Sequence, residues 1–245
     1  MQAKDRIVLA LDGMSKYDIE SHVDKLQDLI GVFKLCPDSL MRHGPDFIRN
    51  LAYNNKVQIF LDLKLHDISN TVENGVAAAV EMGVKYLTIH SSVGSRAMEA
   101  AVRRASNYPT QLLAITILTS FDQEIYKEVY GEHSIEMPDR IEQLASLAMA
   151  SGMHGCVCSV QESGAISIKR SQTHRPEFAI VVPGVRMVGD AVNEQKRVAT
   201  PSEAFQRGAD IIVVGRPITN AADPRMAAEN ILLEITRSWE RSLDG

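Results

Sequence analysis

The sequence is poor in cysteine and in long apolar runs. It contains three cysteines, and this odd number favours reduced, small hydrophobic side chains in a cytoplasmic protein over a framework of disulfide bonds. No apolar run reaches the length of about 18 residues that a transmembrane helix needs, so no membrane association is expected. The amino-terminal residues enter a strand-like segment directly, without the pattern of a signal peptide. We therefore expect a cytoplasmic protein.

Basic segments and metal-binding patterns are also scarce. Aromatic residues make up 5% of the chain, and no basic run contains interleaved aromatic residues. Together with the net charge of −5, this argues against nucleic acid as a partner. Cys156 and Cys158 are one residue apart, whereas redox and zinc pairs have a two-residue spacer. No metal role is therefore expected for this pair, and Cys36 is interpreted as a further small hydrophobic residue.

What the sequence does contain is a regular alternation of two kinds of segment. Apolar runs rich in β-branched residues span residues 6–11, 32–35, 57–65, 86–90, 112–118, 155–159, 178–182 and 211–215. Continuous apolar runs are typical of parallel strands that are covered on both faces. The segments between them carry helix signals, such as a capping Ser15 before a helix that ends at Gly31, and Asp223-Pro224 before the last helix.

Eight strands that alternate with helices in a chain of this length predict an α/β fold, a single-domain (β/α)8 barrel over residues 1–245. The alternative is a doubly wound open sheet. That fold usually has a glycine-rich fingerprint after its first strand. Residues 11–14, Leu-Asp-Gly-Met, do not form one.

A barrel brings the carboxyl ends of its strands together, and polar residues occupy these ends. They are Asp12, Lys34, Asp62, Lys64, His90, Thr119, Ser120, Ser159, Arg186 and Arg216. Singly, each has an ordinary interpretation: Lys34 as a surface lysine, His90 as a satisfied core histidine, Ser159 as a helix cap. Two lysines and two aspartates on the first three strands are together better explained by a site.

The run of charges after the third strand is the most informative part of the sequence. Asp62 and Lys64 are two residues apart, so on a strand they point the same way, and Asp67 lies beyond the strand. Lys34 argues against a divalent metal here, because an ammonium group repels the ion. The aspartates and lysines instead form a nearly neutral network. Lys64, between Asp62 and Asp67, is expected to stay protonated and to act as a proton donor rather than a Schiff-base nucleophile.

The last two strands end in a pattern that indicates a phosphate site. Gly215 lets a phosphate approach the backbone, and Arg216 offers a planar fork of donors. Arg186 adds a second guanidinium, and the following polar stretch, residues 187–199, includes Gln195 and is suited to act as a lid. The alternative is a plain barrel turn with a surface arginine.

The segment 62–71, Asp-Leu-Lys-Leu-His-Asp-Ile-Ser-Asn-Thr, closely resembles the signature of the orotidine 5′-phosphate decarboxylase family. The resemblance extends over essentially the whole chain, and includes the first two strand ends, Leu118-Thr119-Ser120, Pro183-Gly184-Val185-Arg186 and Val214-Gly215-Arg216-Pro217. It implies conversion of orotidine monophosphate to uridine monophosphate and carbon dioxide in pyrimidine biosynthesis, without a metal or any cofactor, by a homodimer.

The resemblance also implies roles for the charged residues. Asp12 and Lys34 would hold the ribose hydroxyl groups, and Lys34 would also belong to the charge network. Asp62 would lie beside the substrate carboxylate, and Lys64 would deliver a proton to C6. Asp67 would act in the site of the neighbouring subunit, which completes a catalytic set of Lys64, Asp62, Asp67 and Lys34.

The remaining expected contacts concern the base, the phosphate and the second subunit. Thr71 would reach the neighbouring site with Asp67, and either Thr119 or Ser120 would face the pyrimidine. The phosphate would be held by Arg186, Gln195, Gly215 and Arg216. Ile68 and Pro183 complete the expected substrate-binding residues.

Two rival functions stay open at this point. One is a metal-dependent sugar-phosphate decarboxylase or epimerase on the same barrel, which predicts loss of activity with a chelator and an acidic residue at position 34. The other is a catalytically silent protein that binds nucleotide phosphates, which predicts tight binding of uridine monophosphate without turnover.

Overall fold

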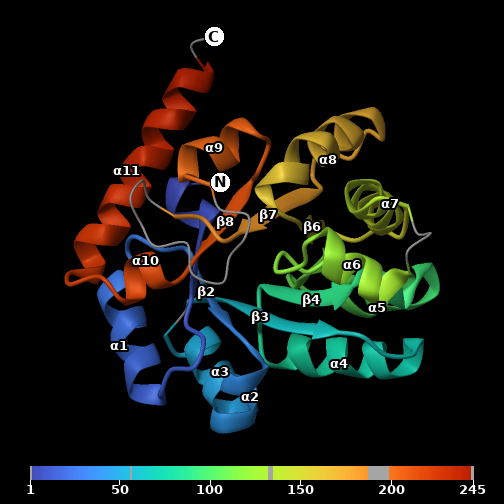
Figure 1. Ribbon diagram of the computed structural model, residues 1–245. Coiled ribbons are helices and arrows are strands. Elements are labelled where there is room, and N and C mark those ends of the chain that lie inside the picture. Colours follow the sequence, from blue (N-terminus) through green and yellow to red (C-terminus); the bar gives the residue numbers. More distant parts are fainter. Residues whose placement is uncertain (1, 56, 132–134, 187–198, 244–245) are drawn as a thin grey trace.

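The eight strands of the protein form a closed parallel barrel in sequence order (Figure 1). The computed structural model describes residues 2–55, 57–131, 135–186 and 199–243, with the backbone alone for 237–243. The barrel closes where β1 pairs with β8, with Ile7 opposite Ile212. The predicted (β/α)8 fold is thereby confirmed, and the open-sheet alternative is wrong.

Each strand lies within or next to one of the eight predicted apolar runs. The strands are β1 (Ile7–Ala10), β2 (Val32–Leu35), β3 (Gln58–Leu65), β4 (Tyr86–His90), β5 (Gln111–Ile115), β6 (Gly155–Val157), β7 (Ala179–Pro183) and β8 (Ile211–Val214). The largest difference is at β5, which ends three residues before the predicted end at 118. Apolar composition continues there beyond the last residue that pairs with β6, Ile115.

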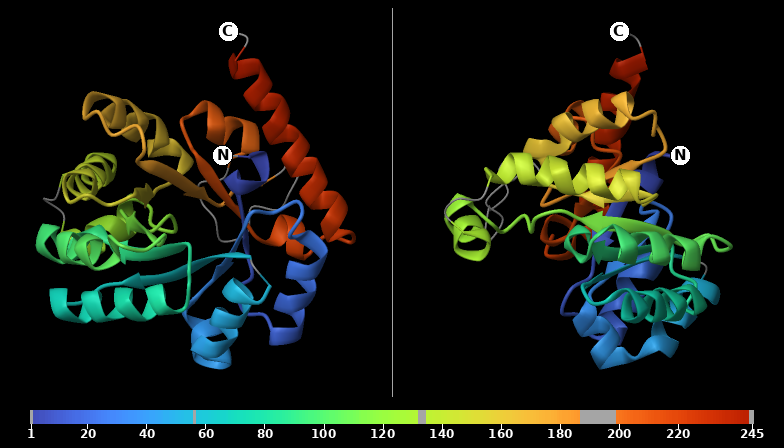
Figure 2. Two further views of the ribbon diagram at one scale, coloured as in Figure 1. Left: turned by 180° about the vertical axis from the view of Figure 1, so that it is seen from behind. Right: turned by 90° about the vertical axis from the view of Figure 1, so that its right-hand side faces the viewer.

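Helices surround the strands on the outside of the barrel (Figure 2). They are α1 (Lys16–Leu26), α2 (Pro37–His43), α3 (Pro45–Tyr53), α4 (Ser69–Glu81), α5 (Ser95–Ala105), α6 (Gln123–Tyr130), α7 (Met137–Ala150), α8 (Val160–Gln172), α9 (Pro201–Gln206), α10 (Arg216–Thr219) and α11 (Pro224–Leu243). Two short 3₁₀ helices, η1 (Ala3–Arg6) and η2 (Ser91–Val93), complete the described elements.

The predicted helix starts at Ser15 and Asp223 are confirmed by their caps. The Ser15 hydroxyl accepts a hydrogen bond from the Asp18 amide at 3.2 Å. Asp223 accepts from the amides of Arg225 and Met226, both at 3.0 Å. Residues 123–130, in the polar stretch that follows β5, form α6, whose first turn is capped by Asp122.

The inner face of the barrel changes from apolar to charged along the strands. Val32 on β2 and Phe60 on β3 belong to the buried cluster in the interior, separate from the larger core between strands and helices. Because side chains alternate along a strand, Lys34 and Asp62, two residues further on, face the same interior. The interior of the barrel is thus apolar in its middle and charged at the carboxyl ends of the strands.

Candidate active site

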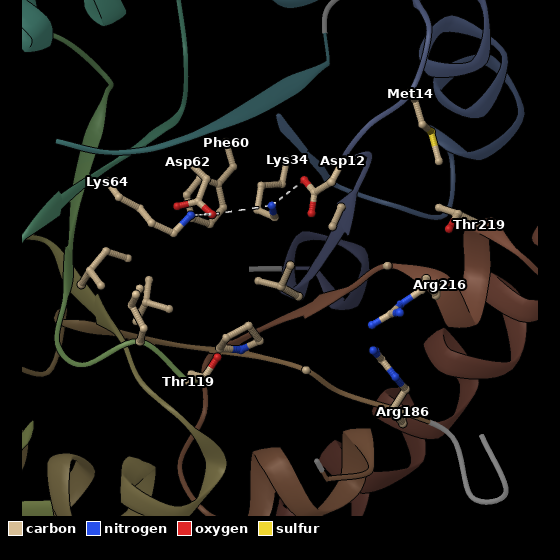
Figure 3. Close-up of a pocket in the computed structure, with 18 of the residues that line it drawn as sticks. Asp12, Met14, Lys34, Phe60, Asp62, Lys64, Thr119, Arg186, Arg216 and Thr219 are labelled. Atoms are coloured by element: carbon tan, nitrogen blue, oxygen red, sulfur yellow. Dashed lines mark hydrogen bonds and ion pairs between the residues drawn. The ribbon is translucent and has the colours of Figure 1, made fainter. Parts of the chain in front are cut away.

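A cavity of ≈ 480 Å³ opens at the carboxyl ends of the strands (Figure 3). It is lined by Ala10, Asp12, Met14, Lys34, Phe60, Asp62, Lys64, Ile115, Ile117, Leu118, Thr119, Val157, Pro183, Gly184, Arg186, Val213, Gly215, Arg216 and Thr219. This is the end of a (β/α)8 barrel where active sites lie. Figure 3 shows four charged residues from Asp12 to Lys64 on one side and two arginines on another.

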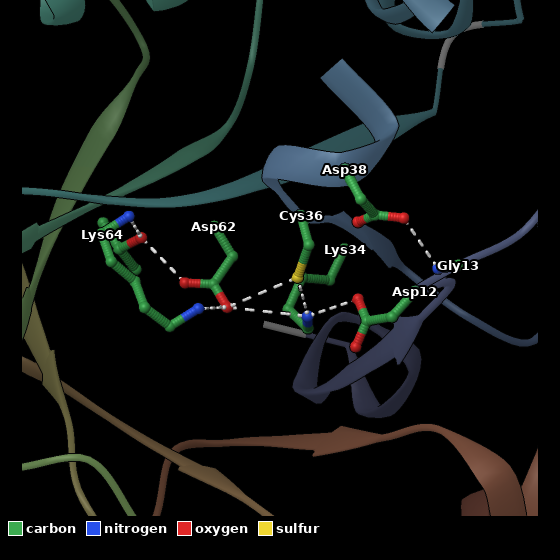
Figure 4. A network of polar contacts seen from close by, with 8 residues as sticks. Asp12, Gly13, Lys34, Cys36, Asp38, Asp62 and Lys64 are labelled. Carbon is green, nitrogen blue, oxygen red and sulfur yellow. Dashed lines mark hydrogen bonds and ion pairs between the residues drawn. The ribbon is translucent and has the colours of Figure 1, made fainter. Parts of the chain in front are cut away.

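The four charged residues form one continuous network (Figure 4). Lys34 Nζ lies 2.8 Å from Asp12 Oδ1 and 3.6 Å from Asp62 Oδ2. Lys64 Nζ lies 2.7 Å from the same Asp62 oxygen. Thr88 on β4 donates to the other oxygen, Asp62 Oδ1, at 2.8 Å. The predicted network of two lysines and two aspartates is therefore present, with its charges in alternating order.

The backbone of β3 departs from a regular strand at Lys64. Lys64 has a φ of 51°, in the left-handed region, and the pairing of β3 with β4 shifts register between Leu61 and Leu65. The Thr88 hydroxyl accepts a hydrogen bond from the Lys64 amide at 2.9 Å. The predicted contact of Lys64 with Asp62 is confirmed, but a bulge held by Thr88 produces it rather than simple alternation. Such strain in a non-glycine residue is typical of functional sites.

The network keeps its buried groups charged. Burial by itself lowers the pKa of Lys34, but the carboxylates of Asp12 and Asp62 outweigh burial and raise that pKa above its ordinary value. Burial likewise raises the pKa of Asp62, but Lys34 and Lys64 outweigh it and hold the pKa below its usual range. At neutral pH, therefore, Asp62 is a carboxylate and Lys34 an ammonium group, although both residues are buried.

Sequence reasoning missed the part that Cys36 plays in this network. Lys34 Nζ donates to Cys36 Sγ at 2.8 Å, and the thiol lies 4.0 Å from Asp62 Oδ2. The thiol is free, as expected, but the interpretation of Cys36 as merely a small hydrophobic residue is wrong. The signal was available, because Cys36 follows Lys34 by two residues and so shares its face of the chain.

The two arginines lie at the other end of the cavity from Lys64 (Figure 3). Arg186 is buried, and its Nη1 donates to the Val185 carbonyl at 2.9 Å. Arg216 is the first residue of α10, directly after Gly215. Figure 3 shows the two guanidinium groups pointing toward one another. Two guanidinium groups facing one space suit an anion with several oxygens, such as a phosphate.

Two further residues at this end were not predicted. Met14 and Thr219 line the cavity near Arg216 (Figure 3). Thr219 follows Arg216 by three residues on α10, and this spacing places both on one face of the helix. The spacing was visible in the sequence, but the short helix that gives it meaning was not predicted.

The other predicted site residues fall into three groups. Thr119 and Pro183 line the cavity, whereas Ser120 is exposed and is not among the lining residues. Asp67, Ile68 and Thr71 are exposed around the start of α4, outside the cavity of their own chain. Gln195 and the rest of residues 187–198 of the expected lid lie outside the described residues.

His90 and Ser159 lie at strand ends but not in the cavity lining. The rings of His90 and His66 pack with their centroids 5.0 Å apart. Burial, His66 and Lys64 lower the pKa of His90 to about 4, so it is neutral at physiological pH. The Ser159 hydroxyl accepts from the Gln161 amide at 3.2 Å, which makes Ser159 the cap of α8.

Histidine, cysteine, aspartate and glutamate side chains are the usual protein ligands of metal ions. Among those that the structure describes, no group of three or more histidine, cysteine, aspartate or glutamate side chains is arranged to hold a metal ion. No described helix is both long and apolar enough to cross a bilayer.

The closed barrel and the charged cavity at its carboxyl end define the protein as one of the (β/α)8-barrel enzymes. Residues 5–231 match the model of the orotidine 5′-phosphate decarboxylase / HUMPS family, and the chain belongs to this family. The family resemblance inferred from the segment 62–71 is thereby confirmed.

Relatives and solved structures agree with this assignment. The chain is 42% identical over 239 residues to an orotidine 5′-phosphate decarboxylase of Trichlorobacter lovleyi, covering 96% of each chain. It is 40% identical to one of Nitrosococcus oceani, covering 95% of this chain and 98% of the relative. The crystal structure of orotidine 5′-phosphate decarboxylase from Lactobacillus acidophilus superposes with a TM-score of 0.81 at 31% identity, covering 94% of this chain and 99% of that one.

Proposed function

We propose that the protein converts orotidine 5′-phosphate to uridine monophosphate and carbon dioxide in pyrimidine biosynthesis, by a metal-free route through a C6 carbanion that Lys64 protonates. The observation that carries the proposal is the ammonium of Lys34 between the carboxylates of Asp12 and Asp62, with Lys64 on the far side of Asp62 and facing the cavity. The family and the names of its relatives supply the substrate.

Lys64 is suited to the most difficult step of this reaction. Loss of carbon dioxide leaves the electron pair in an sp² orbital at C6, where the ring delocalises it poorly. An ammonium group fixed at this position stabilises the developing negative charge more than the ground state, which is the condition for a faster reaction. The 2.7 Å contact with Asp62 and the Thr88 hydrogen bond to its amide hold Lys64 in place before substrate binds.

Asp62 would act on the other partner of the breaking bond. A substrate carboxylate beside Asp62 is a like-charge contact, which costs about 4 kcal/mol at ~4 Å and an effective dielectric constant near 20. This repulsion disappears when neutral carbon dioxide leaves. The low pKa of Asp62, which Lys34 and Lys64 maintain against burial, keeps the carboxylate ionised for this role.

The rest of the cavity offers binding groups in the order that a nucleotide requires. Arg186, Gly215 and Arg216 would hold the phosphate, Asp12 and Lys34 the ribose hydroxyl groups, and Thr119, with Pro183 beside it, the pyrimidine. Binding energy at the phosphate, remote from C6, can be used to position the reacting carbon against Lys64. Gln195 belongs to the same proposal as a lid residue over the phosphate.

The proposal includes a homodimer in which each chain completes its neighbour's site. Asp67 and Thr71 are exposed and lie outside the cavity of their own chain, and the side chain between them, Ile68, is 72% exposed. An exposed apolar residue flanked by functional polar groups fits a subunit interface. A cytoplasmic location agrees with the three free thiols.

One assay separates this function from its rivals. The ultraviolet absorbance of orotidine monophosphate is followed with the purified protein in excess chelator, and the product is identified by chromatography. We expect turnover to uridine monophosphate at the same rate with and without chelator. Loss of activity in chelator would favour the metal-dependent rival. Binding of uridine monophosphate without any turnover of orotidine monophosphate would favour the silent binding protein and sink the proposal.

A further inference from the structure

Cys36 is the member of the charge network that the proposed mechanism leaves without a task. It follows β2 directly and precedes α2, which begins at Pro37. Its sulfur contacts Lys34 Nζ at 2.8 Å and lies 4.0 Å from Asp62 Oδ2 (Figure 4). It is not among the residues that line the cavity, whereas Lys34 and Asp62 are. Cys36 therefore can act only through Lys34 and Asp62 and not on a bound ligand.

The geometry around Lys34 shows what the sulfur contributes. An ammonium group has three N–H donors. In the described part of the chain, Asp12 Oδ1 and Cys36 Sγ each accept one of them at 2.8 Å, while Asp62 Oδ2, at 3.6 Å, is an ion-pair partner beyond hydrogen-bond distance. The sulfur thus fixes the direction of the ammonium group where Asp62 does not. The third donor remains for a group bound in the cavity.

A neutral thiol performs this task without disturbing the charges. Two lysines and two aspartates balance one another, and a thiolate would add a negative charge 4.0 Å from Asp62. Burial raises the pKa of the Cys36 thiol to about 12, against the opposing effect of Lys34, so the proton stays on sulfur at physiological pH. The thiol can then accept from Lys34 and donate to Asp62, which joins the two groups across their 3.6 Å gap.

We propose that Cys36 is a positioning residue, which holds the Lys34 ammonium at a fixed place between Asp12 and Asp62 and thereby sets the field that Asp62 and Lys64 present to the reacting carbon. The inference rests on the proposed decarboxylation. It requires a hydrogen-bonding group at position 36 and a lysine at position 34. It does not require sulfur as such, because a hydroxyl group can also accept from Lys34 and donate to Asp62.

The test compares Cys36→Ala, which removes the hydrogen bond, with Cys36→Ser, which retains a donor and an acceptor. We expect kcat to fall about ten- to a hundredfold in Cys36→Ala, the range for loss of a hydrogen bond to a charged group, and by no more than about threefold in Cys36→Ser. KM should change less than kcat. Cys156→Ala, which removes a buried thiol from the core between strands and helices, is the matched control and should retain the wild-type kcat.

A double-mutant cycle distinguishes positioning from packing. In a Lys34→Ala background the Cys36→Ala change should have little further effect on kcat, because the group that Cys36 positions is absent. Three results would each overturn the inference. They are equal losses of kcat in Cys36→Ala and Cys36→Ser, an undiminished kcat in Cys36→Ala, and the same fold-loss from Cys36→Ala with and without Lys34. Melting temperatures show whether each variant is folded. If Cys36→Ala is unfolded, Cys36→Ser alone tests the inference: a retained kcat supports it, and a loss of kcat overturns it. Absence of wild-type turnover would instead count against the proposed function.

Discussion

The two ends of the barrel use the same kind of ion pair in different surroundings. At the amino end, Arg170 binds Asp210 and the Phe178 carbonyl, and Asp210 also accepts from the Ile180 amide at 2.8 Å. At the carboxyl end, Lys34 and Lys64 flank Asp62 beside an open cavity. The amino-end pair is surrounded by backbone partners and joins α8 to the starts of β7 and β8. The carboxyl-end network has one side turned to a space for a ligand.

This difference indicates that ion pairs at one end serve stability and those at the other end serve chemistry. Arg170 and Asp210 are not among the residues that line the cavity and bond to neighbouring backbone groups, so this pair contributes to the stability of the fold. A network with donors facing a cavity can transfer binding energy, charge or a proton to a ligand.

The largest effect is expected for Lys64→Ala, which should lower kcat by about 10³-fold or more because both the electrostatic stabilisation at C6 and the proton donor are lost. The melting temperature should change little, because the Asp62 carboxylate keeps Lys34 and Thr88 as partners when the Lys64 side chain is removed. Steady-state assays and thermal melting measure the two quantities. Lys25→Ala, at an exposed position on α1, is the control. Undiminished turnover by Lys64→Ala would remove the proton-donor role.

Mixing two inactive variants tests whether Asp67 completes the site of the neighbouring subunit at the carboxyl end. Lys64→Ala and Asp67→Ala are unfolded together, refolded and assayed. If Asp67 serves the neighbouring site, half of the dimers are mixed and each contains one complete site, so about a quarter of the wild-type activity returns. If Asp67 serves its own chain, no complete site forms and the mixture remains as inactive as its components.

At the arginine end of the cavity, Arg216→Ala should raise KM by about 30- to 100-fold with a smaller change in kcat. The reason is the loss of charge-assisted hydrogen bonds to the phosphate. Initial rates over a range of substrate concentrations separate the two constants. Arg104→Ala, at an exposed position on α5, should leave both unchanged. An unaltered KM in Arg216→Ala would take this residue out of the phosphate site.

At the amino end, Asp210→Ala should lower the free energy of unfolding by about 2–3 kcal/mol, because Arg170 and the Ile180 amide lose a partly buried partner. The kcat of the folded enzyme should not change. Urea unfolding gives the first quantity. Glu177→Ala breaks the exposed pair with Arg175 at the same end and should have almost no effect. A catalytic defect in folded Asp210→Ala would contradict the division between the two ends.

The smallest effect is expected for His90, which lies at the carboxyl end but is interpreted as structural. Its pKa is lowered to about 4 by burial, His66 and Lys64, so the folded protein resists a proton that the unfolded chain takes up near pH 6.5. The contribution of neutral His90 to the free energy of unfolding is therefore fully present above about pH 6.5, and this contribution is lost as the pH falls toward 4.

His90→Asn should weaken this dependence, so that its melting temperature falls less than that of the wild type between pH 7 and about pH 4.5. His174→Asn is the control, since His174 is exposed and its φ of 53° is one that asparagine tolerates. Identical pH profiles of wild type and His90→Asn would show that His90 does not contribute to this dependence.

Most of the barrel was predictable because its signal is local. Apolar runs alternate with capped helices, and neither pattern depends on distant residues. The ends of elements were less predictable: the predicted apolar run continues to residue 118, whereas the last residue of β5 in register with β6 is Ile115. Pairing with a neighbour decides where a strand ends, and that neighbour lies tens of residues away.

The candidate site was predictable in its residues but only partly in its contacts. The meeting of Asp62 with Lys64 was expected from alternation, yet the bulge at Lys64 depends on Thr88 of the next strand. The contact of Cys36 with Lys34 escaped prediction, because composition alone classes a cysteine with the hydrophobic residues. Met14 and Thr219 escaped it because they follow the strand ends, in segments whose paths composition does not specify.

The sequence by itself determined the number of strands and the kinds of charge at their carboxyl ends. These follow from local patterns, the apolar runs and the polar residues after them, which are properties of the chain. Only the tertiary structure decided which charges touch. Asp12, Lys34, Asp62 and Thr88 come from or directly follow four different strands, and closure of the barrel places them within hydrogen-bond and ion-pair distance of one another. It also placed the thiol of Cys36 against Lys34.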